Sequence, residues 1–411
     1  MDHERTLEQI TAADVERWRA ETPLVATGRI HLNNAGAAAP PVSVVERVER
    51  YLRAESELGG YEAADAAASE IDSVYRRVAD VIGAQPRNVA LVENATVAYA
   101  QAMSAFDFEP GDALVTTRND YVSNQLLFLS LARRRGVVVH HAEDLAAGGV
   151  DCESLRRLLA QTRPKLVSLS LVPTNTGLVQ AGEAVGAVCR EAGVPYLVDG
   201  CQAVGQIPVD VEALGCDFFC ATGRKYLRGP RGTGFLYVSD AMLDSGREPL
   251  AIDLRGADWT DPSSYRAADD ARRFENWEFS YALVVGLGEA ARYALAAGIG
   301  RTTRRAAALA AFARERLSER PWARLLDRGE RLAAIVSVEV AGLDAGALQS
   351  ELRERGIHVG TSDRAGALLD MDAKGSVAAT RISPHYYNTE GEIEAAITAI
   401  DEVVRSAGRS S

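Results

Sequence analysis

The chain has 411 residues, which at about 150 residues per domain corresponds to two or three folding units. Hydrophobic residues make up 47% and charged residues 25% of the chain, which is globular usage and excludes a disordered or fibrous protein. The 45 basic and 57 acidic residues leave a formal charge of −12, which argues against the basic surface that nucleic-acid binding needs.

The sequence carries no sign of a membrane segment or a metal site. No window reaches about 18 uninterrupted apolar residues, and the charged, helix-like start lacks a signal-peptide pattern. The five cysteines show no metal-ligand spacing, and those in apolar runs are predicted to be buried thiols. We therefore expect a cytoplasmic protein with no membrane, nucleic-acid or metal partner.

The predicted elements of the first two thirds of the chain alternate between strand and helix. Residues 1–27 are predicted to form a helical segment that packs on a smaller domain, with its helix ending near Pro23. Residues 28–281 are predicted to form the large domain, in which apolar strands separated by helices indicate a mostly parallel sheet covered on both faces. The predicted strands are 29–32, 89–92, 113–116, 137–140, 166–171, 196–198, 218–221 and 234–237, and the helices between the last seven are 98–106, 123–135, 155–161 and 182–192.

Residues 282–411 are predicted to form a smaller α+β domain. It begins with a long Ala- and Arg-rich helical stretch over 282–316 and closes with a helix over 390–407. Within the first stretch, Gly286 and Gly288 match the spacing of a dinucleotide-binding turn. No acidic residue ends a second strand about twenty positions later, so we interpret these glycines as small residues that let two helices pack closely.

Polar residues cluster where the predicted strands end, which is where open parallel sheets bind ligands. Asp199 ends one strand, Lys225 follows the next, and Ala95 and Thr96 begin a helix whose free N–H groups can bind an anion. Only three of the 45 basic residues are lysine, and Lys225 alone stands at a strand end; Lys165 and Lys374 are expected on the surface.

An anion site, a carboxylate that can keep a ring nitrogen protonated and a lysine that can act as an amine nucleophile are what pyridoxal 5'-phosphate (PLP) requires. Arg224 beside Lys225 is expected to lower the pKa of that lysine, as is burial against apolar residues.

The segments YLVDGCQAVGQIPVDV and CDFFCATGRKYLRGPRGTGFLYV resemble the two signature stretches of the class V aminotransferase superfamily. These fold type I PLP enzymes include cysteine desulfurases, isopenicillin N epimerase-like proteins and kynureninase. The resemblance covers residues 32–388. It implies an α/β fold with a large, mostly parallel seven-stranded sheet domain and a smaller α+β C-terminal domain.

The resemblance also implies roles for single residues around the cofactor. Lys225 matches the Schiff-base lysine, Asp199 the partner of the pyridine nitrogen and Gln202 the partner of the phenolic oxygen. The other implied cofactor residues are Ala95, Thr96, Thr222 and Arg224 at the phosphate, Asn175 near the ring oxygen, and Tyr121 stacked on the cofactor face. Ser280 matches a residue that reaches the phosphate of a partner subunit, which implies a homodimer with shared sites.

Arg381 matches the arginine that binds the substrate carboxylate, and Tyr61 and Asn34 are expected to contact the substrate. Specificity is expected in the loops 33–36, 59–62 and 362–366. Cysteine desulfurases carry a catalytic cysteine in the loop before that arginine. Here residues 356–380 contain none, and the last cysteine of the chain is Cys220, which argues against persulfide chemistry.

The segments ELGGYEAAD, GRKYLRGPRGTG and RISPH are most similar to hercynylcysteine sulfoxide lyases and their relatives. We therefore predict carbon–sulfur bond cleavage, by β-elimination, of a cysteine S-conjugate or its sulfoxide. An epimerase or racemase and an aminotransferase remain as alternatives, because all three reactions begin when Lys225 removes the Cα proton. A non-catalytic protein with this fold is the alternative from another class, and the presence of Lys225 argues against it.

Overall fold

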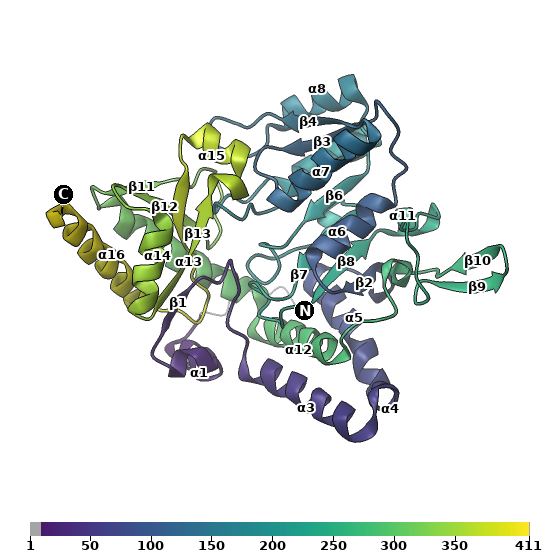
Figure 1. Ribbon diagram of the computed structural model, residues 1–411, viewed down its shortest axis with the longest axis horizontal. Helices are drawn as coiled ribbons and strands as arrows, with labels where there is room; N and C mark the ends of the chain where they lie inside the picture. Colours follow the sequence, from purple (N-terminus) through teal and green to yellow (C-terminus); the bar gives the residue numbers. More distant parts are fainter. Residues whose placement is uncertain (1–9, 411) are drawn as a thin grey trace.

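The structure is a computed structural model that describes residues 10–410, and its strands form three sheets (Figure 1). The largest sheet has the strand order β2-β8-β7-β6-β5-β3-β4. Neighbouring strands from β4 to β7 are parallel, whereas β8 is antiparallel to β7 and β2. The seven strands predicted for this sheet are confirmed, with ends shifted by at most two residues: β2 (Val89–Val92), β3 (Ala113–Thr117), β4 (Val138–Ala142), β5 (Leu166–Ser170), β6 (Tyr196–Asp199), β7 (Phe218–Thr222) and β8 (Gly234–Val238).

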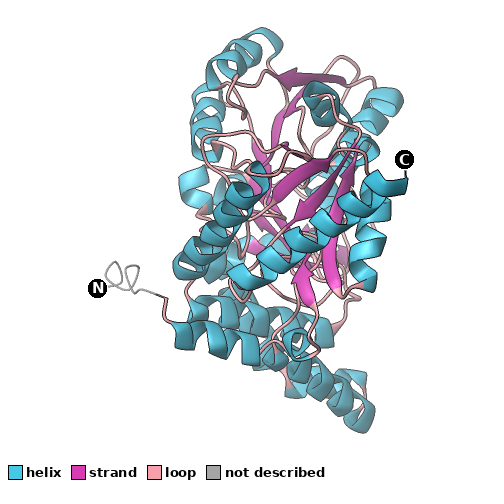
Figure 2. Ribbon diagram, turned by 90° about the vertical axis from the view of Figure 1, so that its left-hand side faces the viewer, coloured by secondary structure: helices cyan, strands magenta, loops and turns pink. Residues whose placement is uncertain are grey.

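Both faces of this sheet are covered by helices, which enclose the strands in the side view of Figure 2. Successive side chains of a strand point to opposite faces. Leu197 and Phe218 therefore pack in one hydrophobic cluster with α6 and α7, and Val198 and Phe219 pack in another with α5, α8, α9 and α12. The helices of this part are α3 (Val42–Leu58), α4 (Gly60–Ala66), α5 (Ala68–Ile82), α6 (Ala95–Ser104), α7 (Val122–Arg135), α8 (Cys152–Thr162), α9 (Gly182–Ala192), α10 (Val211–Leu214), α11 (Asp240–Asp244) and α12 (Tyr281–Ala297).

The second sheet combines strands from both ends of the chain, in the order β1-β13-β14-β12-β11. Strand β1, which we assigned to the large domain starting at residue 28, pairs in parallel with β13, and Ile30 lies opposite Ile357. The domain boundaries as such stay a prediction. The elements of this unit are β1 (Ile30–Leu32), α13 (Ile299–Ser318), β11 (Ala323–Leu325), β12 (Val336–Val340), α14 (Ala345–Glu354), β13 (Ile357–Asp363), α15 (Leu368–Lys374), β14 (Ala378–Ile382) and α16 (Glu390–Ser410).

The helical stretch predicted over 282–316 is two helices, because Gly298 has a φ of 81° and ends α12 before α13 begins. No single helix among residues 10–410 is long and apolar enough to span a membrane, and α12 and α13 pass that criterion only together, across an 80° bend. The packing interpretation of the two glycines is confirmed. A Cβ on Gly286 would lie 2.6 Å from Val48 on α3, and one on Gly288 would lie 2.7 Å from Val74 on α5.

A hairpin of β9 (Ala257–Asp261) and β10 (Ser264–Ala267), which the sequence analysis did not predict, projects from the large-sheet unit (Figure 1). Its side chains are mostly exposed, and Trp259 at 80% and Tyr265 at 49% are large hydrophobic residues open to solvent. A hairpin of this kind has no core of its own and is stabilised by whatever it packs against.

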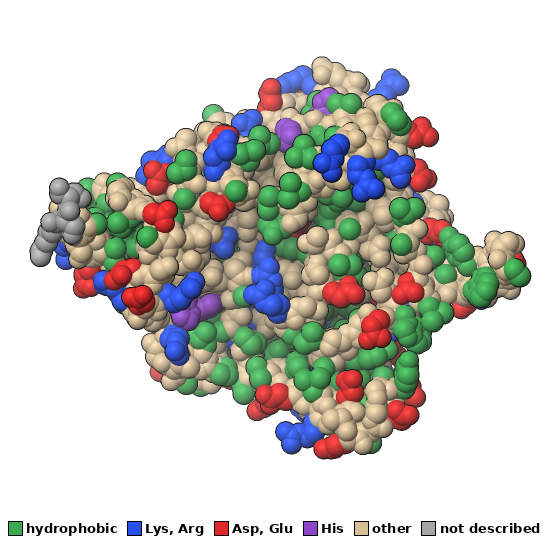
Figure 3. Space-filling model, viewed as in Figure 1, with side chains coloured by type: hydrophobic (Ala, Val, Ile, Leu, Met, Phe, Trp, Pro, Cys, Tyr) green, Lys and Arg blue, Asp and Glu red, His purple; other side chains and the backbone are tan. Residues whose placement is uncertain are grey.

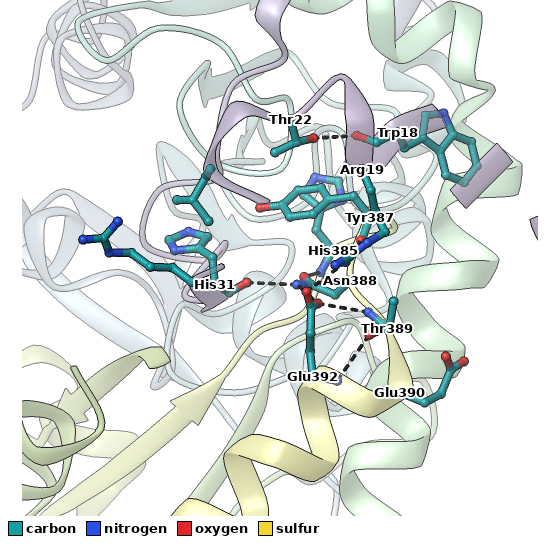
Figure 4. Close-up of polar contacts among 12 residues, drawn as sticks. Trp18, Arg19, Thr22, His31, His385, Tyr387, Asn388, Thr389, Glu390 and Glu392 are labelled. Carbon is teal, nitrogen blue, oxygen red and sulfur yellow. Dashed lines mark hydrogen bonds and ion pairs between the residues drawn. The ribbon is translucent and has the colours of Figure 1, made fainter. Parts of the chain in front are cut away.

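The N-terminal helices α1 (Ala12–Ala20) and α2 (Pro23–Ala26) are joined to the segment before α16 by polar contacts (Figure 4). Arg19 donates to the backbone oxygen of Tyr387 at 2.9 Å and forms an ion pair with Glu392 at 2.8 Å. Asn388 donates to the backbone oxygen of His31 at 3.2 Å. The predicted helix does end before Pro23, where α2 begins; its residues 1–9 lie outside the described part of the chain.

His385 in this cluster is held in its neutral form. Its Nδ1 accepts a hydrogen bond from the backbone N–H of Tyr386 at 2.9 Å, so its Nε2 carries the proton and donates to the Tyr226 carbonyl at 3.0 Å. Burial, together with the nearby Arg228 guanidinium, lowers the pKa of His385 well below its ordinary value. A protonated ring would lose the hydrogen bond from Tyr386.

We expect the stability of the protein to fall as the pH drops below about 6.5, because the unfolded chain then binds a proton that folded His385 excludes. In His385→Gln this loss should shrink by up to about 1.4 kcal/mol per pH unit. Urea denaturation between pH 5 and pH 8 measures the difference, with His140→Gln on edge strand β4 as the control. An unchanged pH slope in His385→Gln would contradict the prediction.

Candidate functional site

Lys225 lies in a turn after β7, at the carboxyl edge of the large sheet. Its side chain is buried, and its Nζ lies 5.8 Å from the centre of the Tyr121 ring. Burial lowers the pKa of Lys225, and the cations Arg224 and Arg381 act in the same direction. The structure thus places a buried lysine with a lowered pKa next to the Tyr121 ring, and the role of Lys225 at the cofactor stays a prediction.

Asp199, the last residue of β6, is a buried carboxylate held by two donors. Its Oδ1 accepts from the backbone N–H of Cys201 at 2.9 Å, and its Oδ2 accepts from the side chain of Asn124 at 3.1 Å. Neutral donors on both oxygens stabilise the ionised form and fix the direction in which it faces. Asp199 contributes to the electrostatic environment of Lys225, so the two predicted catalytic groups share one site.

An anion site is available at the start of α6. Asn94 caps this helix by accepting from the N–H of Val97 at 3.0 Å. Ala95 and Thr96 precede Val97 in the first turn, where N–H groups have no partner within the helix. Thr222 donates to the Thr233 backbone oxygen at 3.2 Å.

The cation of this region is Arg224, which is half-buried and donates to the backbone oxygen of Gly36. Its position in the turn places a permanent positive charge beside Lys225. In Figure 3, Lys and Arg side chains lie at the centre of the face, between the two halves of the molecule.

Gln202 and Arg381 meet at Thr174, a residue that the sequence analysis missed. Gln202 donates to the Thr174 hydroxyl at 3.0 Å, and Arg381 donates to the Thr174 backbone oxygen at 2.6 Å. Gln202 Oε1 and Arg381 Nε are both buried and have no hydrogen-bond partner within the described part of the chain. Buried polar atoms normally have partners, so an acceptor and a donor left open here indicate a ligand position.

Asn33, which lies in the expected specificity loop 33–36, faces the same position. Its Oδ1 is buried without a partner among residues 10–410. A Cβ on Gly360 would lie 2.7 Å from this oxygen and 3.0 Å from Arg381 Nη2. Ser362, two residues along the same face of β13, also has a buried hydroxyl without a partner in the described chain. Because Gly360 has no side chain, a space lined by these polar groups stays open beside Arg381.

Three predicted site residues lie elsewhere or are occupied. The Asn175 amide donates to Asp370 at 2.6 Å. Asn34 donates to the Ser383 backbone oxygen at 2.8 Å and accepts from the Tyr387 hydroxyl at 2.6 Å, so both ends of its amide are used. Tyr61 on α4 is 74% exposed. Roles for these residues at the cofactor or substrate stay predictions, and no contact among residues 10–410 supports them.

Ser280 caps α12 by accepting from the N–H of Leu283 at 3.4 Å, and it is exposed. Lys374, expected on the surface, is buried and pairs with Asp370 at 2.6 Å. That expectation was wrong because the carboxylate four residues earlier, together with Asn175, gives the ammonium group a buried partner.

The profile of the family described as aminotransferase class-V matches residues 30–396. The chain is a member of the aminotransferase class-V family. A probable cysteine desulfurase from Synechocystis sp. is 27% identical over 397 residues, which cover 92% of this chain and 91% of the relative. A probable hercynylcysteine sulfoxide lyase from Mycobacterium tuberculosis is 28% identical over 389 residues, with 94% and 92% covered.

Among solved structures, the apo cysteine desulfurase from Thermococcus onnurineus NA1 has a TM-score of 0.87 and 26% sequence identity. The alignment covers 95% of this chain and 98% of that one. The fold of this class-V chain is therefore the fold type I architecture of PLP enzymes, and PLP is its cofactor.

The chemical groups of the site match those that PLP needs. Lys225 supplies the amine, Asp199 a fixed carboxylate, the start of α6 an anion site and Arg224 a permanent cation. The open Gln202 Oε1 supplies an unused acceptor in the same site. These are different kinds of group, and each matches a different part of the cofactor.

Proposed function

We propose that this class-V protein is a PLP-dependent lyase that cleaves the carbon–sulfur bond of a cysteine S-conjugate or its sulfoxide. One observation carries the proposal. The site holds a lysine, a carboxylate and an arginine (Lys225, Asp199 and Arg381) beside a loop that contains no thiol. Residues 356–380 contribute β13 and α15 to the site region but no cysteine. Relatives that share the whole fold are named for carbon–sulfur chemistry, as a desulfurase and as a sulfoxide lyase.

The thiols of the chain do not suit sulfur transfer. Cys201 is the cysteine nearest to the site, and burial, followed by the neighbouring Asp199 carboxylate, raises its pKa far above the ordinary value. Burial likewise raises the pKa of Cys189 to about 12. A nucleophilic cysteine needs a thiolate, which such surroundings disfavour. This supports a reaction in which sulfur leaves with its substituent and is not captured by the enzyme.

Each side chain of the site has its own role in the proposed reaction. Arg381 binds the α-carboxylate of the amino acid through its open Nε, in the space that Gly360 leaves. Lys225, whose pKa burial lowers, removes the Cα proton on its side of the substrate. Bound PLP supplies an electron sink for the Cα electron pair, and Asp199 supports that role by holding the ring nitrogen protonated. The sulfur substituent then leaves Cβ, and water converts the released product to pyruvate and ammonia.

The proposal is tested by incubating the purified holoenzyme with cysteine S-conjugates and their sulfoxides and measuring pyruvate. Pyruvate formation that requires Lys225 is expected. Alanine and persulfide as products would identify a desulfurase instead. Solvent deuterium at Cα of intact substrate without pyruvate would indicate an epimerase, and product that requires an added keto acid would indicate an aminotransferase.

Arg381→Lys is expected to raise KM by about ten- to hundredfold, because an ammonium cannot replace a guanidinium that binds a carboxylate in a fork. Cofactor occupancy, measured by absorbance, should stay unchanged. Arg324→Lys on exposed strand β11 is the control. Equal KM values for Arg381→Lys and the unaltered enzyme would remove Arg381 from the substrate site.

We also propose that the enzyme is a homodimer in which Ser280 reaches the phosphate of the partner's cofactor. Ser280 is exposed in the single chain, and Trp259, Leu250, Leu254 and Trp277 are large hydrophobic side chains exposed in the same part of the fold. Figure 3 shows hydrophobic side chains on the projecting hairpin and the surface beside it. Exposed apolar patches of this kind mark protein interfaces.

Light scattering should give twice the chain mass, and Trp259→Glu should reduce it to one chain. Ser280→Ala should weaken PLP binding without altering the mass. A Trp259→Glu protein that remains dimeric would show that this surface is not the interface.

A further inference from the structure

A second buried carboxylate, Asp120, lies behind Asp199 and takes no part in the chemistry described above. It stands between β3 and α7 and is 4% exposed. Three hydroxyls, one backbone amide and one side-chain amide donate to it at 2.6–3.0 Å: those of Thr116, Ser168, Ser170, Tyr121 and Asn124. Donors that surround both oxygens match an ionised carboxylate, since a protonated one must itself donate.

Asn124 connects the two carboxylates. Its Nδ2 donates to Asp120 Oδ1 at 3.0 Å and to Asp199 Oδ2 at 3.1 Å. Asn124 is 4% exposed and lies in the first turn of α7. The side-chain amide of Asn124 therefore bridges two buried carboxylates.

Asp120 also fixes the aromatic ring of the site. Its Oδ1 accepts from the backbone N–H of Tyr121 at 2.7 Å, where α7 begins. The Tyr121 ring faces Lys225. One carboxylate thus determines the position of the residue beside the lysine and, through Asn124, the position of Asp199.

We propose that Asp120 and Asn124 are positioning residues that hold Asp199 toward the PLP ring nitrogen and add a second negative charge that keeps this nitrogen protonated. The proposal rests on the role assigned to Asp199. Two charges interact far more strongly through protein than through water. A second buried carboxylate therefore affects the proton that Asp199 holds on the ring nitrogen.

The groups that face Asp120 do not offset its charge. Burial raises the pKa of Tyr99 on α6 and of Cys220 on β7 well above their ordinary values, so both are neutral near pH 7. Burial lowers the pKa of His141 on β4, which disfavours its cationic form. Asp199 carries the other negative charge, and both charges act on the ring nitrogen.

The test uses holoenzyme reconstituted with PLP labelled with ¹⁵N in the ring, whose chemical shift reports protonation of that nitrogen. Asp120→Asn and Asn124→Ser should move the shift toward the unprotonated value and lower kcat by about ten- to hundredfold with little change in KM. Asp217→Asn is the matched control. Asp217 also accepts from a backbone N–H, that of Tyr196, and from a serine hydroxyl, but it lies at the opposite edge of the sheet.

The two failures are distinguishable. If Asp199→Asn leaves the ¹⁵N shift unchanged, the role of Asp199 in the proposed function is wrong, and the role of Asp120 falls with it. If Asp199→Asn moves the shift but Asn124→Ser and Asp120→Asn do not, only the positioning proposal is overturned. Asn124→Ser keeps both carboxylates and decides the matter alone if Asp120→Asn does not fold.

Discussion

Lys225→Ala is expected to lower kcat by at least about a thousandfold and to abolish the covalent fixation of the cofactor to the protein by borohydride. The reason lies in geometry. The amine is buried beside Tyr121 and shares its site with Asp199, whereas the other two lysines are held in ion pairs, Lys165 with Asp112 and Lys374 with Asp370. Arginine cannot take over, since it stays protonated. The cofactor absorbance that stays with the protein after borohydride treatment, denaturation and desalting, together with pyruvate formation, measures both effects.

Lys165→Ala is the matched control and should keep both the covalent fixation and the activity. Thermal unfolding of the two apo variants should agree with that of the unaltered protein, since neither lysine carries a fold-defining contact. Cofactor that stays on denatured, borohydride-treated Lys225→Ala would place the covalent bond on another residue and overturn the assignment of the whole site.

Arg228→Met is expected to lower the free energy of unfolding by at least about 3 kcal/mol. Its guanidinium is fully buried and donates to the Ala39 backbone oxygen at 2.8 Å, the Tyr386 hydroxyl at 2.8 Å and the Thr22 hydroxyl at 2.6 Å. It also lies 4.6 Å from the centre of the Tyr387 ring. Methionine fills the space but leaves these buried acceptors without donors.

The backbone contributes separately, because Arg228 has a φ of 63°, a left-handed conformation that costs a non-glycine residue about 1–2 kcal/mol. Arg228→Gly removes this strain but also empties the space of a large, fully buried side chain, so we expect it to destabilise at least as much as Arg228→Met. Urea denaturation measures both, and exposed Arg231→Met in the same loop is the control. A loss below about 1 kcal/mol in Arg228→Met would contradict the prediction.

The sequence predicted the parts of this protein that local patterns determine. The seven strands are apolar runs bounded by turns, and Asp199 and Lys225 stand at strand ends where ligands bind in such sheets. Asp120, Asn124 and Thr174 were not predicted, because their roles arise from contacts between segments far apart in the chain. One signal was available for the buried Lys374, since Asp370 lies one helical turn before it.

The hairpin β9–β10 could have been predicted in part, because apolar and polar residues alternate on both sides of the turn at Pro262 and Ser263. The place of β1 in the second sheet could not have been predicted. Its three residues pair with β13, and no local pattern in Ile30–Leu32 indicates a partner so distant in sequence. Tertiary packing decides such assignments, and propensity does not.

The pairing of Ile30 with Ile357 sets an order of events during synthesis on the ribosome. The strands of the seven-stranded sheet lie between residues 89 and 238, so this sheet can form while the C-terminal third is still being made. Strand β1 emerges first but must wait, unpaired, until β13 has left the ribosome. A strand that is synthesised long before its partner exposes unpaired backbone N–H and C=O groups for that whole interval. The brevity of β1, three residues, limits what that edge can wrongly pair with in the meantime.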